Sequence, residues 1–567
     1  MTRNIDHKRL GRLRQSQGEI ANHIIDEFAA GRLSRRDFIR RATVVGVSVP
    51  LLGSILEACG SSSPSTSSTA SSSATATGTG APGAVIRAGI TTPAAAINPL
   101  TVADQGGLDM LAQTGEYLTL AAQDLTLKPV LATSWSANTA ADVWTFKIRQ
   151  GVKFHDGSPL TADDVVYTYK QQVGPGKNSA LGGVLLPSGV VKVDDYTVAF
   201  HLEGPNGNFP YLTSSENYNM IIMPNNYNPA NWQSSFIGTG PFVLSSYTPK
   251  IGANFTRNES YWGTKALPSQ TQFTFFDTQP PSILALTGGT IDVLGQFSVV
   301  GGEALLNNSS YNIIKLKAST HRELSMRCDQ APFTDPRVRQ AIALTLNRPQ
   351  IVSALFHGAA DVGNDSPFWS GFASTDSSIV QRTQNISQAK SLLVAAGHPN
   401  GFTTTLSTEN IQEIPSFAQI IAQSAAAIGV KINLNVESQS KYYGNFLFGG
   451  SDWLDATMSL VDYGHRSVPN LFLGAPLQTI NTKTGTGVWN AAHFNNSQYD
   501  TLVTQYVAAL DLSTQRSIAG QIQTLLLQQT PVIYAYFYNY LTATATGVTG
   551  VYPTAIGHLF LYNAAKS

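Results

Sequence analysis

The chain has 567 residues, with 36 basic and 36 acidic residues, and only 13% of it is charged, against about 25% in an average globular protein. Ten of the basic and six of the acidic residues lie in residues 1–58, which leaves 26 basic and 30 acidic residues in the remainder. A body with this slight acidic excess offers no basic field to nucleic acid, so we expect no nucleic-acid partner.

The N-terminal region has the features of an export signal. Residues 34–39 read SRRDFI, and this stretch, with Arg35 and Arg36, resembles the twin-arginine motif that routes folded proteins across a bacterial membrane. The uncharged run from Ala42 to Leu56 has fifteen residues, fewer than the roughly 20 that a membrane-spanning helix needs. We therefore expect residues 1–58 to be a removable signal, with a short transmembrane anchor as the alternative.

The signal ends at a cysteine. Residues 56–59 read LEAC and resemble a bacterial lipobox, which implies that Cys59 is lipidated and anchors the chain at a membrane. Residues 59–83 are rich in Ser, Thr and Ala without a large apolar side chain, so we expect a flexible tether. The protein is then exported to the outer face of the cytoplasmic membrane or the periplasm. An ordinary signal that happens to contain a cysteine is the alternative.

Beyond the tether, strand and helix signals alternate as far as the C-terminus. The 509 residues after the signal are too many for one core, so two or three domains are expected. Val143–Arg149 puts Trp144, Phe146 and Ile148 on one face of a strand, and residues 191–202 predict a hairpin that turns at Asp194-Asp195. No second apolar run is long enough to span a bilayer.

The helices have clear start and stop signals. Asn385 caps a predicted helix that ends at Gly397, and a second apolar stripe over residues 417–428 ends at Gly429. Residues 430–436 then alternate as a half-buried strand does, which makes an α/β unit. A further helix is predicted over Arg516–Gln529. These stripes predict core packing and indicate no ligand.

Several stretches in chain order are more specific than periodicity. Residues 130–170 read VLATSWSANTAADVWTFKIRQGVKFHDGSPLTADDVVYTYK. The others are GTGPF at 238–242, PFTDPRVRQAI at 332–342, the helix residues 389–397, the IGV turn at 428–430, and Arg516 ahead of the last helix. Together they resemble the extracellular solute-binding proteins of family 5, the peptide, dipeptide and nickel-binding receptors of ABC importers. The resemblance covers about residues 84–567.

The resemblance implies an α/β, two-lobed fold of the periplasmic-binding-protein type (class II, large cluster, with an extra subdomain), with mixed sheets flanked by helices. Lobe I takes residues 84–312, with a subdomain at about 120–237, and a C-terminal return at 530–567; lobe II takes 313–529. A small solute, peptide or peptide-like, is captured between lobes that close by hinge motion. Permease and ATPase subunits are the implied partners of a monomer that is not an enzyme and holds no cofactor or metal.

The resemblance also implies a ligand-binding aspartate. In peptide-binding members an aspartate followed by tyrosine binds the ligand's amino group, and Asp462-Tyr463 fits that position. A carboxylate in a dry cleft is costly to desolvate unless it is paired, so a ligand ammonium is a natural partner. The family's following Asp-Pro is absent, and Arg466 stands nearby instead. The alternative is an aspartate that caps a loop or pairs with Arg466.

Other candidate residues follow from side-chain chemistry. Arg466 and Arg322 could pair with a ligand carboxylate through the planar guanidinium, with a structural arginine as the alternative at each. Tyr463, Trp453 and Trp489 are candidate walls of the solute pocket, because aromatic sides bury ligand surface well. Each of these aromatics could equally belong to the core.

The sequence leaves other function classes open. The ten histidines include no HxxxH or HxH pair, so no direct metal site is expected, and His155 is expected to be bonded near a turn. A receptor for a metal chelate or another non-peptide solute remains an alternative. A secreted hydrolase built on Asp455 or Asp462 is a weaker one, since no nucleophile elbow, HExxH helix or phosphate loop is present. The third alternative is a receptor body that acts as a sensor or chaperone without a transporter.

Overall fold

The structure, a computed structural model, describes residues 24–26, 28, 29, 33, 38, 42 and 83–567, except 95–96, 175–178, 229–235 and 482–485. Arg35, Arg36, Cys59 and most of the tether lie outside the described residues, so the export motif and the lipid anchor stay predictions. Among the described residues, no helix combines the length and the apolar character that crossing a membrane requires.

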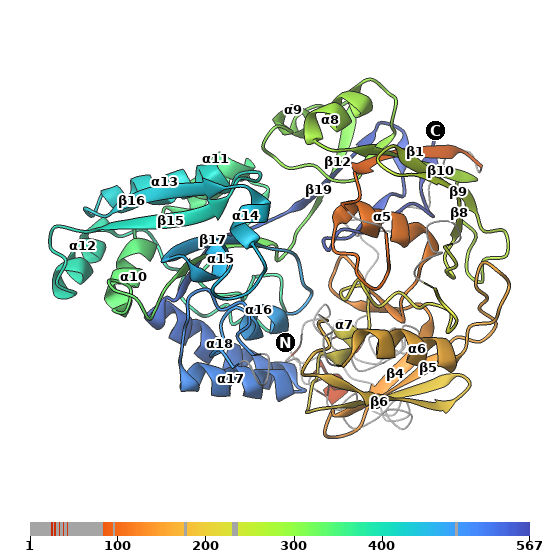
Figure 1. Ribbon diagram of the computed structural model, residues 1–567, viewed down its shortest axis with the longest axis horizontal. Coiled ribbons are helices and arrows are strands. Elements are labelled where there is room, and N and C mark those ends of the chain that lie inside the picture. Colours follow the sequence, from red (N-terminus) through yellow and green to blue (C-terminus); the bar gives the residue numbers. More distant parts are fainter. Residues whose placement is uncertain are drawn as a thin grey trace. The chain divides into compact units, whose positions relative to one another are not determined.

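The chain divides into two units (Figure 1). Unit 1 takes the residues up to Phe297, Asn307–Ile314 and Leu541–Ser567, and unit 2 takes Ser298–Leu306 and Lys315–Tyr540. The sequence predicts the C-terminal return at residue 530, whereas the structure places it at Leu541. The reason is that β18 (Val532–Tyr538) is an inner strand of the sheet of unit 2.

Unit 1 is built on a seven-stranded mixed sheet with the order β12-β19-β11-β1-β10-β9-β8. Its centre is β1 (Val85–Thr91), which runs parallel to both neighbours, β10 (Gln270–Phe276) and β11 (Val293–Leu294). The remaining strands are β8 (Phe242–Thr248), β9 (Gly252–Arg257), β12 (Tyr311–Leu316) and β19 (Tyr540–Ala545). Helices α5 (Gln105–Thr114) and α8 (Gln279–Thr287) pack on β1.

A second sheet of unit 1 is antiparallel, in the order β4-β5-β7-β6. Its strands are β4 (Ala132–Ala137), β5 (Val143–Ile148), β6 (Leu185–Asp194) and β7 (Thr197–Leu202), and α6 (Ala162–Gln172) packs on it. Two predictions are confirmed here. The side chains of Trp144, Phe146 and Ile148 are buried on one face, and β6 and β7 form the hairpin that turns after Asp194.

The other elements of unit 1 are short. They are β2 (Thr119–Ala121), β3 (Leu127–Pro129), α7 (Phe209–Leu212), β20 (Val548–Thr549), β21 (Tyr552–Pro553), β22 (Leu559–Phe560) and β23 (Ala565–Lys566). His155 lies near the turn that the sequence predicts, where its Nε2 donates to the Gly240 carbonyl at 3.0 Å. Its interpretation as a structural histidine is confirmed.

Unit 2 is built on a six-stranded sheet with the order β14-β18-β13-β17-β15-β16. Besides β18, the strands are β13 (His321–Met326), β14 (Ala360–Val362), β15 (Thr403–Glu409), β16 (Lys431–Glu437) and β17 (Met458–Tyr463). β13 is antiparallel to β17 and β18, whereas β15 is parallel to both β16 and β17. The carboxyl ends of β15, β16 and β17 therefore meet at one edge, the usual place for a ligand in open α/β sheets.

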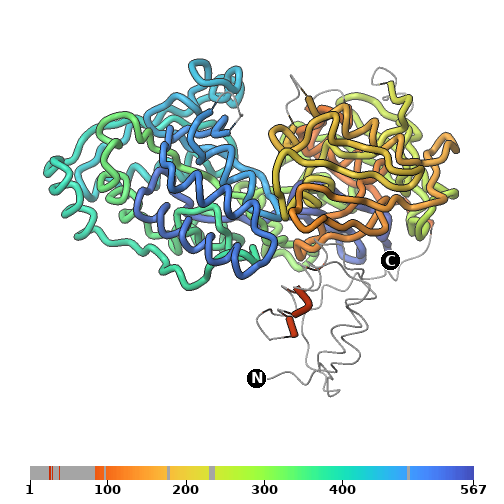
Figure 2. Tube along the Cα trace, turned by 90° about the horizontal axis from the view of Figure 1, so that it is seen from below, coloured from red at the N-terminus to blue at the C-terminus, as the bar shows by residue number. Residues whose placement is uncertain are grey.

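The helices of unit 2 are α9 (Glu303–Leu306), α10 (Pro336–Ala343), α11 (Arg348–Phe356), α12 (Ile386–Ala395), α13 (Ile414–Ala426), α14 (Gln439–Tyr443), α15 (Asp452–Asp455), α16 (Asn470–Gly474), α17 (Ser497–Ala508) and α18 (Leu512–Gln529). Five of them, α10, α11, α12, α17 and α18, begin at a residue whose side chain caps the helix. Asn385 caps α12 by accepting from the Gln388 N–H at 2.9 Å, as predicted. Helix α18, which packs beside α17 (Figure 2), starts before the predicted Arg516, because Asp511 caps it through the Thr514 N–H.

One buried carboxylate ties the GTGPF stretch to the rest of unit 1. Glu116 accepts hydrogen bonds from the Thr239 hydroxyl (2.8 Å), the Tyr261 hydroxyl (2.7 Å) and the Trp262 indole N–H (2.8 Å). Burial raises the pKa of Glu116 from 4.5 to about 7, and the three hydrogen bonds oppose that shift. The folded protein consequently holds this proton more tightly than the unfolded chain does.

The stability of unit 1 should depend on pH through Glu116. A carboxyl group whose folded pKa lies above its unfolded value favours folding increasingly as the pH falls from about 7 to 4.5. Replacing Glu116→Gln should remove this gain, up to about 3 kcal/mol, measured by denaturant unfolding at pH 5 and pH 7. The exposed Glu203→Gln is the control, and an unchanged pH dependence in Glu116→Gln would contradict the assignment.

Candidate functional site

The candidate site lies at the edge of unit 2 where β15 and β17 end. The two strands pair in parallel, with Ser407 opposite Ser459 and Thr408 opposite Leu460. Glu409 ends β15 and Asp462 stands one residue before the end of β17. Both carboxylates thus lie at the same carboxyl edge, and the start of α13 follows β15 closely along the chain.

A buried arginine organises this edge. The side chain of Arg322 is 0% exposed, and it stands directly opposite Asp462 in the β13–β17 pair. Its Nε donates to Glu413 at 2.8 Å, and its Nη2 donates to Glu413 at 3.2 Å and to Gln412 at 2.8 Å. Its Nη1 donates to Tyr538 at 2.7 Å and to Asp462. All five N–H groups therefore have acceptors.

Asp462 is the exposed member of this cluster. Its Oδ1 accepts from Arg322 and from the Tyr538 hydroxyl at 3.1 Å. The side chain is 36% exposed, and among the described residues no hydrogen bond or ion pair involves its Oδ2. Its structural partner is Arg322 and not Arg466, because the strand register places residues 322 and 462 opposite each other.

Glu413 balances the buried guanidinium. Its side chain is almost fully buried at the start of α13, and it also accepts from the Tyr536 hydroxyl at 3.2 Å. Since Glu413 neutralises Arg322, the charge of Asp462 is left without full compensation. The sequence analysis missed Glu413, Gln412 and Tyr538. The only available signal was their position, directly before α13 or at the end of a strand.

A second carboxylate, Glu409, lies beside this cluster and was also missed. It accepts from the Tyr443 hydroxyl at 2.8 Å and from Gln439 Nε2 at 3.2 Å. Burial raises the pKa of Glu409 above its usual range, and the nearby charge of Asp462 adds to the shift, while the hydrogen bond from Tyr443 opposes it. The edge therefore holds more negative than positive charge.

The structure places the predicted aromatics in two groups. Tyr463 is buried, and its ring lies 6.4 Å from the half-buried Trp489, centroid to centroid. Trp453 is also buried, and it packs edge-on against Tyr443 at 5.6 Å. Trp453 thus contacts the tyrosine that binds Glu409, whereas Tyr463 and Trp489 form a ring contact of their own.

Arg466 lies apart from the carboxylates. Its Nη1 donates to the His465 carbonyl at 2.6 Å, and its backbone N–H donates to the Ser319 hydroxyl at 2.9 Å. Within the described part of the chain, no ion pair involves its guanidinium. Of the two predicted arginines, Arg466 alone keeps N–H groups that a ligand carboxylate could take.

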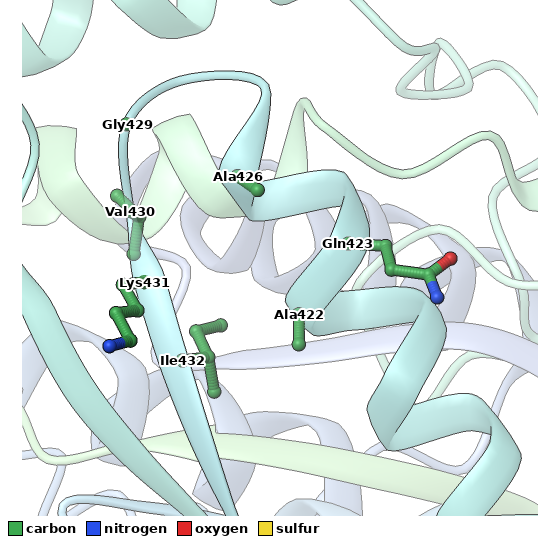
Figure 3. Close-up of a pocket in the computed structure, with 7 residues that line it drawn as sticks. All are labelled: Ala422, Gln423, Ala426, Gly429, Val430, Lys431 and Ile432. Carbon is green, nitrogen blue, oxygen red and sulfur yellow. The ribbon is translucent and has the colours of Figure 1, made fainter.

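In the part of the chain that the structure describes, neither a cluster of metal-ligating side chains nor the pocket beside α13 lies at this edge. Among the described residues, no group of three His, Cys, Asp or Glu side chains could hold a metal ion. Burial raises the pKa of the Cys328 thiol to about 11, so it stays protonated. A shallow pocket of about 390 Å³ lies between α13 and β16 (Figure 3), lined by Ala422, Gln423, Ala426, Gly429, Val430, Lys431 and Ile432. None of the site residues lines it.

Comparison with known families identifies the chain. Residues 126–466, more than half of it, match the family model described as bacterial extracellular solute-binding proteins, family 5 Middle. The chain belongs to this family. The predicted resemblance to family 5 is confirmed for the stretches between residues 130 and 430, whereas Arg516 lies outside the matched residues.

Relatives of this family 5 protein span most of its length. Heme-binding protein A of Haemophilus influenzae is 24% identical over 439 residues, which cover 72% of this chain and 78% of the relative. Dipeptide-binding protein DppE of Bacillus subtilis is 24% identical over 489 residues, which cover 80% of this chain and 86% of the relative.

Solved structures show the same fold. DppA from Helicobacter pylori in complex with the peptide STSA has a TM-score of 0.71 at 21% identity, covering 86% of this chain and 98% of that one. HbpA2 from Haemophilus parasuis has a TM-score of 0.73 at 22% identity, covering 85% and 100%. The predicted α/β fold of two-lobed periplasmic binding proteins is confirmed.

Removing the guanidinium should destabilise unit 2 strongly. Arg322→Met leaves Glu413 buried without a counter-charge, which costs about 3–5 kcal/mol for a buried ion pair. The control is Arg337→Met, because Arg337 is 46% exposed and pairs with Asp335 on the surface, where such pairs contribute at most about 1 kcal/mol. Urea denaturation measures both, and equal losses would show that Arg322 has no structural role.

Proposed function

We propose that this family 5 protein is the extracytoplasmic receptor of an ABC importer and that it captures a peptide or peptide-like solute. The single observation that carries the proposal is Asp462. This carboxylate is held through Oδ1 by Arg322 and Tyr538, while its side chain is 36% exposed at the carboxyl edge of the sheet. One oxygen of the carboxylate is held in place, and the other accepts no hydrogen bond from the described residues. This arrangement suits an ammonium group.

The names of the relatives support this solute class. They include dipeptide-binding proteins of Bacillus subtilis and Escherichia coli and a murein peptide-binding protein of Escherichia coli. Solved structures of the same fold hold a peptide STSA, a nonapeptide and Met-Leu. All these ligands are amino-acid chains with polar ends, which is what a carboxylate anchor and a separate arginine would recognise.

The other predicted residues take secondary roles in this proposal. Arg466 is the candidate partner for a carboxylate of the solute, because every N–H of Arg322 is already occupied. Tyr463, Trp489 and Trp453 line or support the apolar walls. Arg322 itself positions Asp462 and does not need to contact the solute.

A receptor for a metal chelate is the second candidate. Heme-binding protein A is among the relatives, and NikZ from Campylobacter jejuni was solved with Ni(L-His). The carboxylate edge offers acceptors for the N–H groups of a coordinated amine. Identification of the captured solute distinguishes the two candidates.

The protein would release its solute chemically unchanged. Asp455, which a hydrolase hypothesis would use, accepts hydrogen bonds from the Gly449 N–H at both oxygens and from the Ser451 N–H. These hydrogen bonds give its carboxylate a structural role in closing the loop. Turnover of ester, peptide or glycoside substrates, lost in Asp462→Asn, would favour the hydrolase instead.

Export and anchoring belong to the same proposal. Arg35 and Arg36 would direct the folded protein through the twin-arginine route, and Cys59 would carry the lipid. The mature monomer would then stay at the outer face of the membrane within reach of its permease and ATPase partners. The tether would give the receptor freedom to meet the permease.

Solute binding should depend on Asp462. Gentle denaturation of the purified protein followed by mass spectrometry should release a peptide or peptide-like solute, and a peptide library should raise the melting temperature. Asp462→Asn should weaken binding about ten- to hundredfold, since a charge-assisted hydrogen bond contributes about 1.5–3 kcal/mol. The exposed Glu303→Gln is the control. No released solute and no thermal shift with peptides or chelates would refute the receptor.

The leader residues should control localisation. Cys59→Ala should move the protein from the membrane fraction to the soluble fraction after cell lysis, because acyl chains supply the anchor. Replacing Arg35 and Arg36 together by lysine should leave the unprocessed precursor in the cytoplasm. Immunoblotting of cell fractions measures both, and unchanged membrane attachment of Cys59→Ala would contradict lipidation.

A further inference from the structure

The carboxylate edge of unit 2 contains more than the Asp462 anchor. Around one guanidinium, that of Arg322, stand three carboxylates: Glu409, Glu413 and Asp462. Glu413 takes two of the five N–H groups of Arg322 and is itself buried. Glu413 therefore compensates much of the charge of Arg322, and one guanidinium is left with more negative than positive charge around it once Glu409 and Asp462 are counted.

Glu409 and Asp462 are close enough to affect one another. Their strands are parallel neighbours, and the charge of Asp462 disfavours ionisation of Glu409. Glu409 is 1% exposed, and its two hydrogen bonds come from Tyr443 and Gln439, which are both neutral. A cation brought by the solute would relieve the repulsion that the protein leaves between the two carboxylates.

An exposed apolar surface adjoins the same residues. Tyr443, whose hydroxyl bonds Glu409, stacks with Phe446 at 5.5 Å between centroids and 13° between planes. Phe446 is 60% exposed, and the next residue, Leu447, is exposed as well. Contiguous apolar side chains exposed at a surface are one of the marks of a binding site.

The loop that carries Phe446 has a fixed backbone. Gly444 adopts a positive φ of 51°, and a Cβ there would lie 2.1 Å from the Gly450 carbonyl oxygen. The Leu447 N–H donates to the Ser451 hydroxyl at 3.1 Å, and the Gly449 N–H donates to Asp455 at 2.9 Å. The exposure of Phe446 is thus built into the loop.

A buried donor points to a ligand at the same place. Trp453 packs edge-on against Tyr443. Its indole N–H is buried, and no acceptor for it exists among the described residues. Buried N–H groups nearly always have a hydrogen-bond acceptor. An acceptor that arrives with the solute, such as a peptide carbonyl, would satisfy the indole N–H of Trp453.

We propose that the exposed Asp462 contacts the ammonium of the solute while the charge of the buried Glu409 beside it strengthens that attraction, and that Tyr443 and Phe446 receive the apolar side chain next to the ammonium. The preferred solutes are then peptides with a free amino terminus and a large apolar first residue. This inference rests on the proposed function, since it assigns the solute class of the Asp462 site. Glu409 and Phe446 are its specificity-determining residues.

The test uses tripeptide amides that carry each amino acid in turn before Ala-Ala, with free and with acetylated amino termini. Calorimetry on the mature protein should show the tightest binding for Phe, Tyr, Leu and Met in first place. Acetylation should weaken binding at least about tenfold, because it removes the ammonium. Equal binding of acetylated peptides, or a preference for Gly or acidic first residues, would overturn the proposal.

Two variants separate the role of Glu409 from that of Phe446. Glu409→Gln should weaken binding of the free peptides about tenfold, and Phe446→Ala should abolish the preference for a large first residue while leaving the Gly peptide unchanged. The matched controls are Glu303→Gln and the exposed Val380→Ala in the same unit. Both variants are expected to melt like the wild type, because glutamine can still accept from Tyr443 and Phe446 is exposed.

A pH profile distinguishes a charge effect from a loss of structure. Glu409 faces Tyr443 and Gln439 from α14, Asp462 from β17 and Arg322 from β13. Because its pKa lies above the usual range, wild-type affinity should fall as the pH drops from 7 to 5 and Glu409 takes up a proton. In Glu409→Gln the affinity should stay flat over that window, and a parallel decline in both proteins would overturn the role of Glu409.

Failure of this inference can be told from failure of the proposed function. If Asp462→Asn abolishes peptide binding while Glu409→Gln and Phe446→Ala bind like the wild type, Asp462 alone anchors the solute and the receptor function stands. If no tripeptide amide binds and a chelate is released from the purified protein, both are overturned.

Discussion

A guanidinium withdrawn entirely from water needs an acceptor for each of its five N–H groups and a counter-charge beside it. In unit 2, Arg322 meets both demands through Glu413, Gln412, Tyr538 and Asp462. These partners come from the loop before α13 and from β17 and β18. The pairing therefore determines how three segments, distant in sequence, meet at the edge of the sheet where the candidate site lies.

The same pairing decides the charge of the site. Glu413 compensates Arg322, so the exposed Asp462 is held in place without being neutralised. An isolated aspartate on a flexible loop would have the charge but not the fixed position. An aspartate paired one-to-one with a buried arginine would have the position but little attraction left for a cation. One guanidinium between two carboxylates, Glu413 and Asp462, gives Asp462 both its fixed position and its negative charge. Glu409 adds further negative charge at the same edge.

Unit 1 uses a buried carboxylate differently. Glu116 is satisfied by three neutral donors, Thr239, Tyr261 and Trp262, and it holds loops together without leaving an open oxygen for a solute. Its hydrogen bonds give a structural reason for the GTGPF stretch, which the sequence analysis had used only as a family signature. The buried Glu116 thus serves structure in unit 1, whereas the half-exposed Asp462 in unit 2 keeps one oxygen without a hydrogen bond among the described residues.

Much of the fold was accessible from local patterns. The hairpin that turns after Asp194, the Asn385 cap and the inward face of Trp144, Phe146 and Ile148 depend on residues near one another in the chain. The stretches that resemble family 5 could also be recognised from the sequence, because each is short and they follow one another along the chain in the family's order. Of the site, the sequence singled out Asp462 and Arg322 as separate candidates, without indicating that they pair.

What the amino-acid sequence determined by itself was the alternation of helices and strands, the caps and the family, since each follows from neighbouring residues. Only the tertiary structure decided that Arg322 faces Asp462 across 140 residues and that β18 joins unit 2. It alone brought Glu409, Glu413 and Tyr443 to one edge. The physical reason is that strand register and charge compensation are properties of non-local pairs, which no local pattern encodes.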